Sequence, residues 1–467
     1  MGSLTSLMDI AQQSLIADQN ALNITSNNVA NQNTPGYTRE VVSWQPDDAV
    51  TLNGQTFYEG ITSSAVSQRD RVLDQRVQQQ TQVQAQSQAL DGALQQVENI
   101  FGLSSSSTSA GTTALGTAID SFFNSFSSLA ANPTDTATRQ SVLDAANTLA
   151  SNFNSASNQI SQIATGLSQQ VSGIVGQVNS LTAAIASLNQ QIGSVSPNSD
   201  AGSLEDQRQQ AINQLSQLVG LDQISTESNG ITLTTSNGAV LVDGGKSFAL
   251  GTTDAAGATD VVSSATGADI TAGLTGGQLG GVLEARDQQI PAYQSSLDNL
   301  AYAIGTQVNS QNVLGLDENG VAGAALFTLS ATATGAASAI AVSTTDPSKI
   351  AAAASTEGAA GNSNAQALAD LASATLVGGS TADGFYSGLL GQIGNDASAA
   401  TTDNSAQQAT LTQLTTQRDS LSGVSLDEEA ANLTTYQRSY EAAAKVFTIV
   451  DQVMADALNL GEQTTVS

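Results

Sequence analysis

Apolar side chains recur every seven residues at both ends of the chain. The row near the N-terminus consists of Met8, Leu15, Leu22 and Val29. The row near the C-terminus consists of Leu426, Leu433, Tyr440, Phe447 and Met454, with Val450 three residues after Phe447. A seven-residue apolar period predicts helices that supercoil with a partner, so we expect the two ends to pair as a coiled coil. The alternative is two ordinary amphipathic helices packed on a globular core.

The middle of the chain continues the helical pattern. Its longest regular run is the heptad row Phe153, Ile160, Leu167, Ile174, Leu181 and Leu188. That row spans about forty residues, or roughly 60 Å of helix, which is longer than the helices of most compact domains. Further helical periodicity lies in 70–101, 117–131, 207–219, 280–309 (with a kink expected at Pro291), 364–371 and 405–421. These patterns predict a rod in which the chain runs out and returns.

Short β signals interrupt this helical pattern. Residues 231–235 and 239–242 flank Ser236-Asn237-Gly238, and Asn-Gly is a turn that joins the strands of a hairpin. We therefore expect a mainly α fold: an elongated helical rod with N- and C-terminal helices pairing as a coiled coil, plus small β-rich insertions. The predicted domains are a terminal coiled-coil core (1–40 and 425–467), a helical rod (41–222, 280–312 and 360–424) and a β-rich insertion (223–279 and 313–359).

The charge balance limits what such a rod can bind. The 467 residues include 41 acidic and 12 basic side chains, for a formal net charge of −29. A surface this acidic repels phosphate backbones and anionic lipids, so we expect no nucleic acid and no membrane as partners. Continuous apolar stretches also stay below the roughly 18 residues that a membrane helix needs.

The chain contains no Cys and no His. The usual general base near neutral pH and the commonest metal ligand are therefore absent, as are thiolate nucleophiles and disulfides. The segment Met1–Met8 lacks the basic region and apolar run of a cleaved secretion signal. We expect a soluble protein, or export by a route that reads no such leader.

Each candidate chemical motif has a simpler structural interpretation. Asp317-x-Asn319-Gly320 could begin a calcium loop, but the twelfth position of that loop is Thr328 rather than Glu. The acidic run 427–429 begins a helix, where it complements the helix dipole. The glycine-rich segment 276–281 lacks the Lys-Ser/Thr ending of a phosphate loop. We therefore predict no catalytic, metal-binding or cofactor-binding residues, no cofactor and no enzyme activity.

Two further features are interpreted as structural. Arg69 and Arg71 with Asp70 and Asp74 form a solvated, partly self-paired helix start, and the lone Trp44 is a packing anchor. The competing function is a carboxylate-based hydrolase, such as a muramidase. It would need two acidic residues facing each other across a cleft, and the sequence gives no indication of such a pair.

One string near the N-terminus is specific enough to suggest a family. Asn27-Asn28-Val29-Ala30-Asn31-Gln32-Asn33-Thr34-Pro35-Gly36-Tyr37-Thr38-Arg39 follows the first apolar row, and its Asn-rich and Pro-Gly chemistry ends a helix. The string resembles the N-terminal signature of flagellar rod, hook and hook-associated proteins. The residues that carry the motif are Asn27, Asn28, Asn31, Pro35, Gly36, Tyr37 and Arg39. The ending 36–39 and the segment 423–440 favour the hook-associated branch, and 204–208, 280–287 and 362–365 resemble further family segments.

This resemblance implies a structural role in the bacterial flagellum, at the junction between hook and filament. It implies that the terminal helices pair in the assembled junction and that their apolar rows form the assembly interface. The implied partners are copies of the chain in a ring, the hook protein, a second junction protein on the filament side, and an export chaperone on the C-terminal helix. Export would use the flagellar type III apparatus and place the chain outside the cell. The alternatives are another axial component (hook protein or second junction protein) and a long coiled-coil adhesin or phage-type structural protein.

Overall fold

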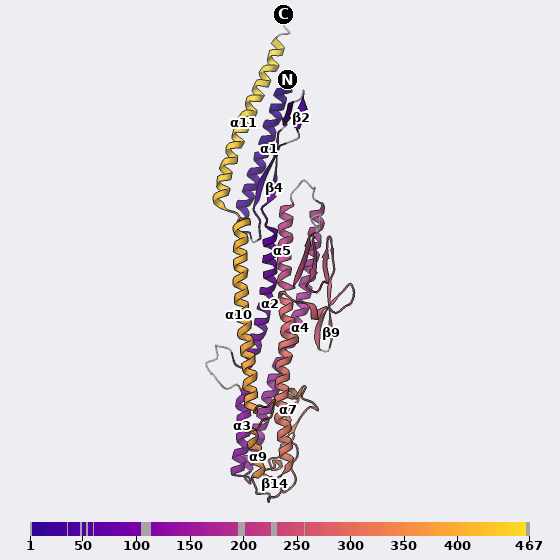
Figure 1. Cartoon of the computed structure of the whole chain (residues 1–467), viewed down its shortest axis with the longest axis vertical. Helices are drawn as coiled ribbons and strands as arrows, with labels where there is room; N and C mark the ends of the chain where they lie inside the picture. The colour runs from indigo at the N-terminus through magenta and orange to yellow at the C-terminus, as the bar shows by residue number, and fades with distance from the viewer. Residues whose placement is uncertain are drawn as a thin grey trace.

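The molecule is an elongated bundle of helices that run along one axis (Figure 1). The computed structural model describes residues 2–463 except 35, 47–48, 53–54, 59, 104–113, 195–200, 226–230 and 256. The α-helices are α1 (Gly2–Asn31), α2 (Arg71–Ile100), α3 (Ala114–Ala131), α4 (Thr136–Ser194), α5 (Gly202–Leu218), α6 (Gly277–Glu284), α7 (Ile290–Leu314), α8 (Ala336–Ala339), α9 (Ser363–Asp370), α10 (Ala382–Ser422) and α11 (Leu426–Gln463).

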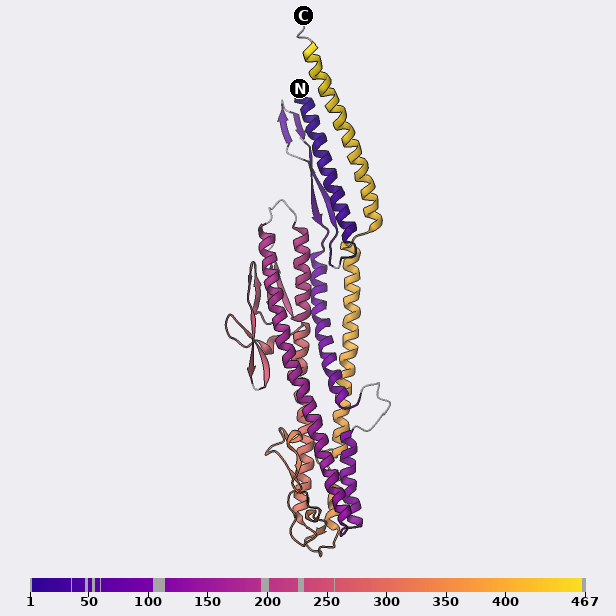
Figure 2. The same ribbon diagram turned by 180° about the vertical axis from the view of Figure 1, so that it is seen from behind.

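The strands form small antiparallel sheets beside this bundle. They are β1 (Glu40–Pro46), β2 (Ala49–Leu52), β3 (Gln55–Tyr58), β4 (Ile61–Ser67), β5 (Leu221–Ser225), β6 (Ile231–Thr235), β7 (Val240–Asp243), β8 (Lys246–Ser247), β9 (Leu250–Ala255), β10 (Ala258–Ser263), β11 (Gly315–Leu316), β12 (Phe327–Thr328), β13 (Ala341–Val342) and β14 (Ala353–Ala354). The β1–β4 and β2–β3 pairs lie next to α1, and the β5-β6-β7-β8 sheet and the β9–β10 hairpin flank α4 (Figures 1 and 2).

The prediction of a mainly α, elongated fold is confirmed. The heptad row 153–188 belongs to α4, a single helix of 59 residues, or about 90 Å at 1.5 Å per residue. The expected hairpin forms between β6 and β7, with Gly238 of the turn at a positive φ of 85° that glycine adopts readily. By length and composition α4 could cross a membrane, but core helices pass the same test. Its apolar side chains Val171, Val178 and Ile185 are fully buried within the bundle.

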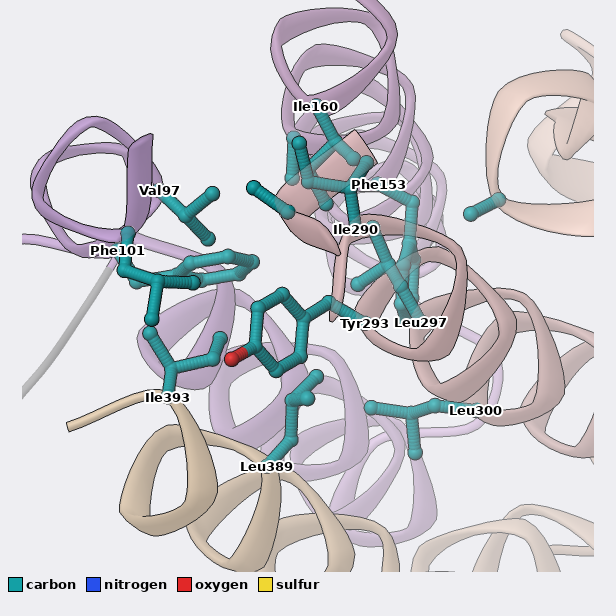
Figure 3. Packing of buried hydrophobic residues seen from close by; sticks show 14 of the residues in the cluster. Val97, Phe101, Phe153, Ile160, Ile290, Tyr293, Leu297, Leu300, Leu389 and Ile393 are labelled. Carbon is teal, nitrogen blue, oxygen red and sulfur yellow. The ribbon is translucent and has the colours of Figure 1, made fainter. Parts of the chain in front are cut away.

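The core of the rod brings α2, α4, α7 and α10 together. Phe153 of α4 and Leu297 of α7 are fully buried, and Tyr293 packs among them against α10 (Figure 3). The Tyr293 hydroxyl donates a hydrogen bond of 2.8 Å to Asp396 of α10, so the one polar group of this ring is satisfied at the edge of the core. Segments far apart in sequence therefore share one core, as expected for a chain that runs out and returns.

Three elements differ in detail from the sequence expectations. The segment 41–67 was predicted to belong to the helical rod, but its described residues form the strand pairs β1–β4 and β2–β3. The β1–β4 pair packs against α1. Helix α10 begins at Ala382 rather than near 405. The sequence does not predict its first half, because that part is rich in Gly, Ala and Ser and has only a weak apolar period. The kink expected at Pro291 corresponds to a π-helical turn over Ala285–Gln289, directly before α7. Proline has no N–H to donate, and an adjacent π turn accommodates that lost helix bond.

Candidate assembly interface

The two terminal helices lie side by side at one end of the molecule, while α3, α9 and β14 lie at the other end (Figures 1 and 2). Asn28 of α1 donates a hydrogen bond of 3.3 Å to Glu429 of α11. Asp18 of α1 shares a side-chain hydrogen bond with Ser439 of α11. From Asn28 to Asp18 the position moves ten residues toward the N-terminus of α1, and from Glu429 to Ser439 it moves ten residues toward the C-terminus of α11. Both contacts therefore belong to one antiparallel register.

The predicted apolar rows are only partly covered by this pairing. On α1, Ala11, Ala21 and Ile24 are buried, and the predicted residues are half-buried: Met8, Leu15, Leu22 and Val29. On α11, Val450 is buried, and three predicted residues are half-buried: Leu433, Phe447 and Met454. Leu426 and Tyr440 remain 49% and 38% exposed. The single chain therefore leaves part of its predicted interface open to solvent.

A second apolar row lies beside the first on α11. Val446, Ile449 and Val453 follow one another at helical spacing and are 47%, 61% and 45% exposed. We call these residues the flank row. The predicted interface residues do not include them, although their spacing of three and four residues is the signal of one helix face.

The N-terminal motif folds around the amide of Asn28, which is 1% exposed. Its nitrogen donates to the carbonyl of Glu40 at 2.7 Å, and its oxygen accepts from the Glu40 N–H at 3.0 Å. The same oxygen accepts from the Tyr37 hydroxyl at 2.9 Å. Burial, together with nearby carboxylates, raises the pKa of Tyr37 to about 12, so its hydroxyl keeps the proton that it donates. One amide thus ties the end of α1 to the start of β1.

The remaining motif residues shape the turn. Asn31 donates to the Asn27 carbonyl at 3.0 Å and accepts from Thr34 at 3.2 Å, which closes the last turn of α1. Gly36 has a φ of 80°, a left-handed conformation that glycine adopts without a Cβ clash. The Asn27 side chain is exposed, and Pro35 lies outside the described residues.

Arg39 joins the motif to α11. Its guanidinium donates to Glu429 at 2.7 Å and to Glu428 at 2.5 Å. Glu429 is 1% exposed and receives hydrogen bonds at both oxygens, from Arg39 and from Asn28. The acidic run in the first turn of α11 therefore also holds the two chain ends together. A buried carboxylate of this kind depends on its partners, because a charge is costly to bury alone.

A second ion cluster connects the motif to the rod. The Thr38 N–H donates to Asp206 of α5 at 3.1 Å. Arg69 contacts Glu205 at 3.3 Å and Asp206 of the same helix, and Asp74 of α2 at 3.8 Å. The expected pairing of Arg69 with Asp74 is present, but the prediction of a solvated helix start is wrong for Arg69. Its side chain is 9% exposed, because it lies against Glu205 and Asp206 of α5. We call Asn28, Tyr37, Arg39, Arg69, Asp206 and Glu429 the joint cluster.

Two features that the sequence singled out, the Asp317 segment and Trp44, make structural contacts. One Asp317 oxygen accepts from the N–H groups of Asn319 and Val321 at 2.8 and 2.9 Å, which makes this segment a turn. The Trp44 ring lies 6.0 Å from that of Tyr436 and anchors β1 on α11. Across the described residues, His, Cys, Asp and Glu side chains form no group of three or more that could hold a metal ion.

Asp18 gives a test of the pairing between α1 and α11. Its side chain is 4% exposed and one carboxylate oxygen has no hydrogen-bond partner among the described residues. Burial raises the pKa of Asp18, only partly opposed by the hydrogen bond with Ser439. A raised pKa in the folded state means that this group favours pairing below its unfolded pKa, and that the benefit is lost as pH rises through the folded pKa.

We therefore expect Asp18→Asn to stabilise the helix pair by about 1 kcal/mol at neutral pH. Hydrogen exchange of the α1 and α11 amides measures this, with Asp9→Asn at an exposed position as the control. Equal protection in Asp18→Asn and the parent chain at neutral pH would contradict the placement of Asp18 in the seam.

An elongated helical subunit whose paired ends keep exposed apolar rows is typical of proteins that assemble into larger polymers. Comparison with known proteins identifies which one. The description "Flagellar hook-associated protein FlgK helical domain" matches residues 94–327, half of the chain. "Flagella basal body rod protein" matches 8–38, and "Flagellar basal body rod FlgEFG protein C-terminal" matches 416–460. The chain belongs to the flagellar hook-associated protein 1 family and is a structural component of the bacterial flagellum.

Full-length relatives support this assignment. Flagellar hook-associated protein 1 of Bacillus subtilis (strain 168) is 30% identical, over 97% of this chain and 97% of the relative. Flagellar hook-associated protein 1 of Escherichia coli (strain K12) is 27% identical, over 98% of this chain and 100% of the relative. The flagellar hook junction protein FlgK of Burkholderia pseudomallei shares the fold, with a TM-score of 0.67 and 21% identity over 75% of this chain and all of that one.

Proposed function

We propose that this chain joins hook to filament as a subunit of the junction, and that its paired terminal helices form the contact with neighbouring subunits. The observation that carries the proposal is the α1–α11 pair, which leaves the flank row and Leu426 exposed on a helix already paired along its other side. Apolar rows left on an exposed helix pair are stabilised when further helices cover them.

The finer organisation is part of this proposal. The terminal unit comprises α1, α11 and the β1–β4 hairpins, the rod comprises the helices from α2 to α10, and the sheets 221–263 and 315–354 are insertions on it. In the junction, the proposed neighbours of this chain are further copies of the chain in a ring, the hook protein on one side and a second junction protein on the other. We propose export through the flagellar type III apparatus, with a chaperone covering α11 until assembly.

We assign the chain no catalytic role. The carboxylates of the terminal unit that could suggest one are committed to structural contacts: Glu428 and Glu429 bind Arg39. Release of sugar from purified peptidoglycan by the intact chain would contradict this assignment.

Ile449→Glu tests the flank row. The side chain is 61% exposed in the single chain, so the free protein should keep its stability within about 0.5 kcal/mol. In the assembly the new charge would be buried against a neighbour, so we expect loss of filaments on hooks, seen by electron microscopy. Gln452→Glu places the same charge on an exposed polar position of α11 and should leave filaments intact. Normal filaments with Ile449→Glu would sink the proposed interface.

A further inference from the structure

A groove runs along the middle of the rod, away from the terminal helices. Its walls are α2 from Gln84 to Ile100 and α4 from Gln159 to Gln170, and α5 and α6 close one end with Gln217, Leu218 and Gln278. The two parts of the groove share Gln96, Leu167 and Gln170, so they form one continuous channel. It extends along about 24 Å of α2 at 1.5 Å per residue.

The lining of this groove is uncharged, which is unusual in a chain with a net charge of −29. Its floor is apolar, with Ile163 half-buried and Leu167 buried. Its rim carries the amides of Gln162, Gln170, Gln217 and Gln278, which make no side-chain hydrogen bond within the described part of the chain. An apolar floor with free amide groups at the rim suits a helix with small, polar, uncharged side chains.

Two glycines leave room for such a helix. Gly92 and Gly166 face the groove, and a Cβ added at either would meet nothing within 4 Å. The subunit's own packing therefore does not require glycine there, although each glycine within a helix costs about 1 kcal/mol relative to alanine. The absent side chains allow a neighbouring backbone to approach closely.

The outer face of α10 has matching chemistry. Thr402, Ala406, Ala409, Gln413 and Thr416 lie at helical spacing and are all exposed. Asp403 is the sole charged residue between Asp396 and Arg418, and it bonds to Ser87 and Gln407. This face is at the level of the groove, because Asp91 of α2 accepts hydrogen bonds from Thr401 and Asn404.

We propose that the groove receives the outer face of α10 from a second copy of this chain. Copies carrying −29 each repel one another, so close lateral contact requires surfaces without charge. The groove and the α10 face are two such surfaces at one level, on different sides of α2. Two different patches make a head-to-tail contact, which closes into a ring when the rotation between copies allows it. The inference rests on the proposed function, since it requires copies side by side in the junction.

Disulfide crosslinking tests this contact, because the chain has no cysteine of its own. Gly166→Cys is combined in turn with Ser398→Cys, Thr402→Cys or Ala406→Cys, which cover two turns of α10. A disulfide forms only when the Cα atoms lie about 4.4–6.8 Å apart. We expect at least one pair to give a ladder of oligomers in oxidised, purified flagella, and monomers from the free protein.

Ser161→Cys is the matched control, since Ser161 is exposed on α4 but does not line the groove. Ser161→Cys combined with the same α10 cysteines should give no ladder of oligomers. If Gly166→Cys weakens α4, Gly92→Cys on α2 takes its place, because Gly92 also lines the groove. Dimers without higher oligomers would indicate a twofold contact and overturn the inference. Monomers from motile cells that carry the chain in their flagella would overturn it as well and leave the proposed function standing. Absence of the unmodified chain from purified flagella would overturn both.

Discussion

Deleting residues 426–467 is expected to abolish assembly while leaving the rod folded. Among the described residues, the hydrophobic core cluster runs from Ala93 to Ala400 and includes no residue of α1 or α11. The rod therefore keeps its core when α11 is removed. The terminal unit loses the partner of α1, the flank row and both carboxylates that hold Arg39.

Two readouts check this deletion. Circular dichroism of the purified truncated chain should show a helical, cooperatively melting protein. Electron microscopy of cells that express it in place of the parent chain should show hooks without filaments. Gln452→Ala, an exposed polar change on α11, is the control and should assemble normally. Filament-bearing hooks built with the truncated chain would refute the role given to α11.

Arg39→Ala has the second largest expected effect. It leaves Glu429, 1% exposed, without its cation, and breaking a buried ion pair from one side typically costs about 3–5 kcal/mol. The Arg39 backbone N–H donates to the carbonyl of Ser422 at the end of α10, and its carbonyl accepts from the Gln68 N–H. The lost ion pair therefore lies where α1, α10 and α11 meet. We expect the α11 amides to lose most of their protection from hydrogen exchange, and filaments to be sparse.

Companion variants separate charge from geometry at this site. Arg39→Lys keeps the positive charge but not the guanidinium that reaches two carboxylates. Its α11 amides should therefore show protection from hydrogen exchange between that of Arg39→Ala and that of the parent chain. Arg39→Ala combined with Glu429→Gln removes the uncompensated charge and should recover part of the stability that Arg39→Ala loses. Unchanged α11 protection in Arg39→Ala would mean that the joint cluster does not hold the terminal unit.

The sequence predicted the paired ends because heptad rows are local patterns. The spacing of Leu433, Phe447 and Val450 defines one face of α11 from the sequence alone, even when the partner helix is unknown. Their antiparallel register was beyond reach, since it depends on contacts such as that between Asn28 and Glu429, 401 residues apart. Such a contact leaves no periodic trace in a single chain.

The contacts of the joint cluster also could not be predicted from the sequence, because they join segments far apart along the chain. The motif 27–39 and the segment 204–208 both resemble family segments, but nothing in the local sequence predicts that the Thr38 N–H donates to Asp206. The acidic run 427–429 fits helix capping equally well, and only the burial of Glu429 reveals its second role. The β1–β4 pair was missed because both strands are largely half-exposed, so that the alternation of buried and exposed positions is weak.

The most direct test of the central claim is deletion of the chain's gene from the chromosome. Hook tips are then examined by electron microscopy, and flagellin in the culture medium is measured. A subunit that joins hook to filament predicts complete hooks without filaments and flagellin shed into the medium, with both restored by a plasmid copy of the parent chain. Filaments of normal number and length on the deletion strain would contradict the account.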